Sequence, residues 1–163
     1  MKKLFVLISC AGIFLSGLVL QSSYEISGHA PWSMLVSSVG SSAWELTKPY
    51  LLVFIMWSFI ELSCLRPHLL HYLSSRIISM HFFLCLSCSA MLLSERLCAA
   101  EPGMLIEIFL CILAAETLQA FLYRSRVRTE LFFVPLMISF AALFFSILFC
   151  SFYPPPFIIF LSA

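Results

Sequence analysis

A chain of 163 residues in which 62% are hydrophobic and 10% are charged lies outside the range of soluble domains, where about a quarter of residues are charged. The formal net charge of +1, without a basic stretch interleaved with aromatic residues, argues against a nucleic-acid partner. The sequence contains no Asp and no Asn, which excludes Asp-based metal loops, Asp-oriented catalytic triads and N-glycosylation sites.

The composition predicts an all-α integral membrane protein, a bundle of five transmembrane helices in one domain over residues 1–163. A spanning helix takes about 20 apolar residues and at least about 17. The second apolar run, residues 50–65, is shorter than that, so its helix is expected to begin upstream at Ser42. The first run is expected to stay uncleaved, because only about six apolar residues precede Cys10, fewer than the core of a signal peptide. The predicted spans are residues 4–20, 42–65, 77–93, 104–123 and 131–153.

The positions of Lys and Arg predict the orientation, because basic residues gather in the cytoplasmic loops of membrane proteins. With the N-terminus inside, Lys48 and Arg96 fall on the outer side and the other basic residues on the inner side. The inner residues are Lys2, Lys3, Arg66, Arg76, Arg124, Arg126 and Arg128. An odd number of spans then places the C-terminus outside, where Tyr153-Pro154-Pro155-Pro156 ends the last helix.

The start of the second helix carries a polar motif. Ser42-Ala43-Trp44-Glu45 has the form of a capping box, in which the Ser42 hydroxyl accepts a hydrogen bond from the Glu45 backbone N–H. Trp44 is expected in the headgroup layer, and Lys48 lies close enough to pair with Glu45. Glu107, in the first turn of the fourth helix, is expected on the same outer side. The motif indicates either a capped and anchored start of a helix or a binding site at the outer mouth.

Four polar side chains are predicted at similar depth in the inner half of the membrane: Glu61, His81, Glu116 and Gln119. Ionisable residues inside spans are costly and therefore mark functional sites. A buried carboxylate against His81 is a candidate pair for binding a proton or a small solute. The alternative is that these groups hydrogen-bond across helices and fix their packing.

The third helix presents His81, Cys85 and Cys88 at i, i+4 and i+7, on one stripe. With a fourth ligand this set suits zinc or copper, and its Cys-x-x-Cys also resembles that of the quinone-linked disulfide-forming membrane enzymes. The third interpretation is that these are buried thiols, because apolar surroundings disfavour a reactive thiolate. Cys98 and Cys150 are both predicted at outer helix ends, where they form a candidate disulfide.

Three motifs along the chain resemble an uncharacterised family of small bacterial polytopic membrane proteins, a domain of unknown function. The family pattern is Asn-Glu-Ser-x-Trp-Glu-His-x-Lys, which matches Ser42, Trp44, Glu45 and Lys48. The other two motifs are Tyr24-Glu25-Ile26-Ser27-Gly28 and Phe152-Tyr153-Pro154-Pro155. Gly40 and Ser41 replace the Asn-Glu pair and Leu46 replaces the His. The resemblance implies a multi-pass protein of the bacterial cytoplasmic membrane and supplies no activity.

The sequence therefore favours a non-enzymatic membrane protein that binds or transports a small solute or protons. The alternative is a membrane-embedded thiol oxidoreductase that uses Cys85 and Cys88. The expected partners are the lipid bilayer and a small solute, with a homo-oligomer left open, and no cofactor is expected.

Overall fold

The computed structural model describes residues 3–28, 30, 33–37, 42–65, 68–96, 101–125 and 129–153. These residues form helices and no strand. The long helices are α1 (Lys3–Gln21), α4 (Ala43–Leu65), α5 (Leu69–Arg96), α6 (Glu101–Arg124) and α7 (Phe133–Phe152). Short helical segments are α2 (Ser23–Ile26), α3 (Ser33–Val36) and the 3-10 turn η1 (Thr129–Phe132). The five long helices are each long and apolar enough to cross a membrane, which confirms the predicted all-α class and indicates a multi-pass membrane protein.

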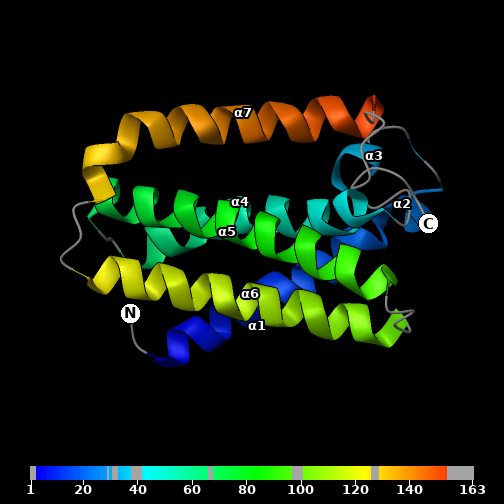
Figure 1. Ribbon diagram of the computed structural model, residues 1–163, viewed down its shortest axis with the longest axis horizontal. Helices are drawn as coiled ribbons and strands as arrows, with labels where there is room; N and C mark the ends of the chain where they lie inside the picture. The colour runs from blue at the N-terminus through cyan, green and yellow to red at the C-terminus, as the bar shows by residue number, and fades with distance from the viewer. Residues whose placement is uncertain are drawn as a thin grey trace.

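The long helices lie side by side along the longest axis of the molecule, and successive ones run in opposite directions (Figure 1). Helices α1, α4, α5 and α6 pack against one another, while α7 packs mainly on α5 and forms an outer layer. Most of the α7 surface is apolar and exposed, including Val134, Ile138 and Phe145. Exposed apolar side chains around a bundle are expected where hydrocarbon replaces water as the solvent.

Helix α4 begins where the capping motif predicts. The Glu45 N–H donates to Ser42 Oγ at 3.3 Å, and the helix starts at Ala43 and continues through Pro49. Helix α5, in contrast, begins at Leu69 rather than Ile77. The added turns contain polar residues, which are typical of a loop when only the sequence is known. In the structure several of these side chains are buried between helices.

Two glycines of α1 allow this helix to approach α4 closely. A Cβ atom at Gly12 would lie 2.2 Å from Trp57 Cη2, and one at Gly17 would lie 2.2 Å from Tyr50 Cδ1. Small residues at such contacts let the backbones approach closely, which strengthens van der Waals packing between helices in lipid. The contact holds α1 against the polar part of the bundle interior.

Candidate functional site

A fully buried arginine lies at the centre of the bundle. Arg76, on α5, is 1% exposed, and its guanidinium reaches two neighbouring helices. Nη1 donates to Glu116 and Gln119 of α6, and Nε donates to Ser58 Oγ of α4 at 2.9 Å. Nη2 donates to the Phe54 carbonyl at 3.3 Å, and the guanidinium carbon lies 4.9 Å from the centre of the Phe54 ring. Since Arg has five N–H donors and stays charged, this network keeps a cation inside the bundle.

A second buried group, Glu61 of α4, connects four helices. Its carboxylate accepts hydrogen bonds from Ser9 of α1 at 2.9 Å and from the Tyr72 hydroxyl of α5 at 2.6 Å. Gln119 Nε2 of α6 donates to it at 3.3 Å, and Arg76 Nη1 lies 4.0 Å away. Glu61 is therefore held by neutral donors with the guanidinium at the edge of ion-pair distance.

The charges of this cluster, which we call the Arg76 cluster (Glu61, Arg76, Glu116 and Gln119), are unequal. One guanidinium faces two carboxyl groups, so the cluster carries an excess negative charge when both carboxyls are ionised. Glu116 uses Oε1 for its ion pair, while its buried Oε2 has no hydrogen-bond partner among the described residues. An uncompensated carboxylate oxygen away from water is costly, and a bound proton removes that cost.

The structure brings together three of the four residues predicted for the inner half: Glu61, Glu116 and Gln119. Among the described residues, His81 forms no hydrogen bond or ion pair with these three, and its Nδ1 contacts the Ile77 carbonyl of its own helix at 2.9 Å. The predicted carboxylate–histidine pair is therefore not formed.

Arg76 itself was missed, because the sequence prediction assigned it to the inner flank of the third span. This assignment is wrong: Arg76 lies within α5 and is buried. One pattern in the sequence could have found it, since Tyr72, Arg76 and Ser79 recur at i, i+4 and i+7. That stripe faces the neighbouring helices, with Ser79 donating to the Ala115 carbonyl of α6 at 2.5 Å.

The residues predicted at the outer mouth separate into two groups in the structure. Lys48 is 0% exposed, and its Nζ donates to Glu45 Oε2 at 2.9 Å and to the Met34 carbonyl of α3 at 2.8 Å. The predicted Glu45–Lys48 pair is thus confirmed, and it ties the segment before α4 to that helix. Trp44 is 4% exposed and packs in the core, whereas the sequence suggested a place among headgroups. Glu107 accepts from Ser94 of α5 and belongs to the contact between α5 and α6.

The two cysteines of the Cys-x-x-Cys motif on α5 differ in exposure. Cys85 is exposed and Cys88 is partly buried, and both are free thiols. Within the described part of the chain, no group of three or more His, Cys, Asp or Glu is arranged to hold a metal ion. Cys98 lies outside the described residues and Cys150 is partly buried on α7, so the disulfide stays a prediction.

Comparisons with known proteins found no match to this chain among protein-family models, curated proteins or solved structures. The interpretation of the Arg76 cluster therefore depends on its geometry and charge alone. The resemblance to the bacterial family stays a prediction.

Proposed function

We propose that the Arg76 cluster binds and releases a proton, in a protein that moves protons or a small solute across the bacterial cytoplasmic membrane. One observation carries this proposal: two carboxyl groups share one guanidinium in the interior of a membrane bundle.

Packing alone does not explain three ionisable groups at this position. Neutral hydrogen bonds between membrane helices already stabilise packing by about 0.6–2 kcal/mol each. A charged side chain at the centre of a spanning helix costs about 2.5–3.5 kcal/mol even on the mildest scale. Ser79 of α5 already supplies a neutral hydrogen bond to the Ala115 carbonyl of α6 beside the cluster. The charges therefore favour a role that neutral groups do not fill.

Within the cluster, Glu116 is the better candidate for the proton site. Glu61 is held by three neutral donors, from α1, α5 and α6, which stabilise its ionised form. Glu116 has one oxygen against Arg76 and the other without a partner among the described residues. Protonation at that free oxygen neutralises the cluster without breaking the bonds around Glu61.

A proton on Glu116 also changes which helix Arg76 binds. With Glu116 neutral, the nearest anion to the guanidinium is Glu61 on α4, 4.0 Å from Nη1 in this structure. Arg76 thus lies between an anion on α6 and an anion on α4, and protonation favours the second partner. Two arrangements of one ion-pair network provide the bistable element that alternating access requires.

The proposed orientation, with the N-terminus inside and the C-terminus outside, depends on the basic residues of the connecting segments. Burial of Arg76 removes it from the inner count, and the inner side still holds the larger number. We place Glu61, Arg76 and Gln119 in the half of the bundle nearer the cytoplasm on this basis.

Infrared difference spectroscopy of the purified protein tests proton binding directly. Lowering the pH should produce a carbonyl band from each carboxyl group that takes up a proton, and Glu116→Gln should remove the band of the buried Glu116 alone. Glu25→Gln, at an exposed position on α2, is the matched control and should leave the band in place. A spectrum that Glu116→Gln leaves unchanged contradicts the assignment, and the absence of any cluster band in the wild type contradicts the proposal.

Reconstitution in liposomes with an entrapped pH-sensitive dye then separates the two kinds of transport. A proton flux that Glu116→Gln abolishes assigns proton transport, whereas a carboxyl band without flux assigns coupling to a solute. The Cys85→Ser/Cys88→Ser variant should change neither measurement. Loss of the flux in that variant would instead support the thiol oxidoreductase alternative.

A further inference from the structure

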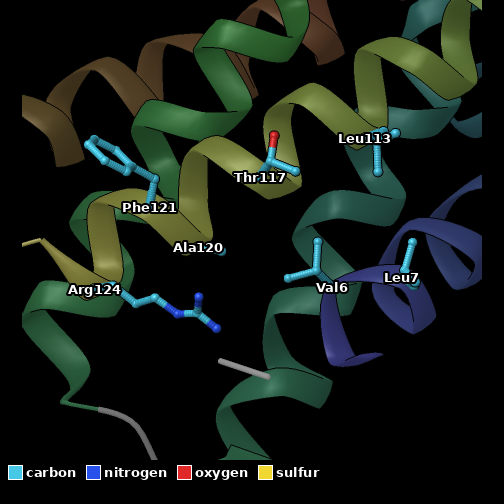
Figure 2. Close-up of a pocket in the computed structure, with 7 residues that line it drawn as sticks. All are labelled: Val6, Leu7, Leu113, Thr117, Ala120, Phe121 and Arg124. Atoms are coloured by element: carbon cyan, nitrogen blue, oxygen red, sulfur yellow. The ribbon is translucent and has the colours of Figure 1, made fainter. Parts of the chain in front are cut away.

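A surface groove runs between α1 and α6. It has a volume of about 480 Å³. Its walls are Val6 and Leu7 of α1 and Leu113, Thr117, Ala120 and Phe121 of α6 (Figure 2). Since α1 and α6 run in opposite directions, the groove joins the beginning of α1 to the end of α6. Apart from the Thr117 hydroxyl, these walls are apolar.

The length of the groove matches one leaflet of a bilayer. Its α6 wall extends from residue 113 to residue 124, which corresponds to about 16 Å at a rise of about 1.5 Å per residue. The hydrocarbon core of a bilayer is about 30 Å thick, so one leaflet is about 15 Å. A groove that starts at the end of a spanning helix therefore reaches about the middle of the membrane.

The charged side chain of Arg124 lies at one end of the groove. Arg124, in the last turn of α6, is exposed and lines the groove, and Figure 2 shows its guanidinium extended from α6 into the space toward α1. In the portion of the chain that the structure describes, this guanidinium has no ion-pair or hydrogen-bond partner. Guanidinium groups bind phosphate through two parallel hydrogen bonds, and basic residues at the membrane surface attract anionic lipids.

We propose that this groove binds an anionic glycerophospholipid, with an acyl chain along its apolar walls and the phosphate against Arg124. Among the described residues, the groove combines apolar walls of one leaflet's length with the guanidinium of Arg124 at its boundary end, which is the complement of such a lipid. A volume of about 480 Å³ suits one small ligand, for which pockets of about 300–1,000 Å³ are typical.

A second groove of the same protein provides a comparison. It lies between α1 and α4, has a volume of about 320 Å³ and is lined by Ser16, Val19, Leu20, Val53, Met56, Trp57 and Ile60. None of its described lining residues is charged. This groove suits an acyl chain but has no group that selects a headgroup. A substitution in it therefore tests the effect of filling an apolar groove without affecting the binding of phosphate.

The test uses the full chain in nanodiscs that contain equal amounts of a phosphatidylglycerol and a phosphatidylcholine with identical acyl chains. Lipids that stay bound after detergent exchange are identified by mass spectrometry. The wild type should retain phosphatidylglycerol preferentially. Arg124→Gln should lower this preference about fivefold, which corresponds to about 1 kcal/mol per basic group near a membrane surface. Thr117→Trp, which fills the groove, should abolish it, while Ser16→Trp in the second groove should leave it unchanged.

Three outcomes would overturn the proposal. The wild type could retain both lipids equally, Arg124→Gln could keep the full preference, or Thr117→Trp could retain as much anionic lipid as Ser16→Trp. Cross-linking of cysteines placed at positions 117 and 121 of separate copies would show instead that a second copy covers the groove. Thermal unfolding of each variant identifies a loss of binding that is caused by a loss of fold.

Discussion

Replacing Arg76 with Met tests whether the Arg76 cluster is held by its charges. Met keeps much of the apolar stem of the side chain and removes the guanidinium with all its donors. The change breaks the ion pair with Glu116 and the hydrogen bonds to Ser58 and to the Phe54 carbonyl. It leaves the carboxyl groups of Glu61 and Glu116 buried without a cation beside them.

The expected loss of stability is large. Removing one partner of a buried ion pair destabilises a protein by about 3–5 kcal/mol, against a total of about 5–15 kcal/mol for a typical domain. At about 2–4 °C per kcal/mol for a chain of this size, the melting temperature should fall by about 6–20 °C. In the double variant Arg76→Met/Glu116→Gln the excess negative charge returns to its wild-type value. The two substitutions should therefore couple favourably by about 1–3 kcal/mol.

Circular dichroism of the purified protein in detergent, recorded during heating, measures these differences. The wild type, the two single variants and the double variant form a complete cycle. Arg124→Met, at an exposed position, is the matched control and should change stability by less than about 0.5 kcal/mol. The reasoning is refuted if Arg76→Met melts within about 2 °C of this control, or if the effects of the two cluster substitutions simply add.

Two further substitutions test the packing around the cluster, both by thermal unfolding. In Gly17→Ala the added methyl carbon would lie 2.2 Å from Tyr50 Cδ1, so α1 must move away from α4, and the free energy of unfolding should fall by about 1–3 kcal/mol. Gly28→Ala is a contrasting control, because nothing lies within 4 Å of its added carbon. Its loss of stability comes only from the backbone φ of +66°. Lys48→Met removes a buried ammonium group whose partners lie on α3 and α4, and should destabilise the protein by about 1–3 kcal/mol. A melting temperature that Lys48→Met leaves unchanged would show that this pair contributes nothing to the fold.

The helices were predictable because of the solvent. In hydrocarbon every backbone N–H and C=O must be paired within the protein, so an apolar run of spanning length becomes a helix almost regardless of its detailed sequence. The start of α4 was also predictable, since Ser42 and Glu45 carry a local capping pattern that needs no information about other helices. The start of α5 was not predictable, because a charged residue such as Arg76 marks the boundary of an apolar run unless its partners on α4 and α6 are known.

The depth of a side chain along its helix was easier to predict than the direction in which it points around the helix axis. Glu61, Glu116 and Gln119 were grouped by depth, and in the structure they meet around Arg76. His81 was grouped with them by the same argument, but it lies five residues after Arg76 on α5. At about 3.6 residues per turn the two side chains point about 140° apart, so both cannot face the same centre. Only the positions of the neighbouring helices decide which of the two is buried there.

The proposed proton site and the proposed lipid site are connected through α6. Glu116 and Gln119 of this helix face Arg76, while Thr117 and Phe121 line the lipid groove. Any change in the spacing of α6 and α5 on protonation of Glu116 therefore alters the groove as well. Linkage requires that proton binding and lipid binding then change each other's affinity by the same factor.

This linkage gives a prediction that combines both sites. The preference of the wild type for phosphatidylglycerol over phosphatidylcholine should change between high and low pH, measured by the nanodisc assay with mass spectrometry. In Glu116→Gln the cluster is permanently without the second negative charge, so the preference should stay at the low-pH value of the wild type throughout. An equal pH dependence in the two proteins would show that the lipid phosphate or another group titrates. The same preference at both pH values in the wild type would show that α6 does not couple the two sites.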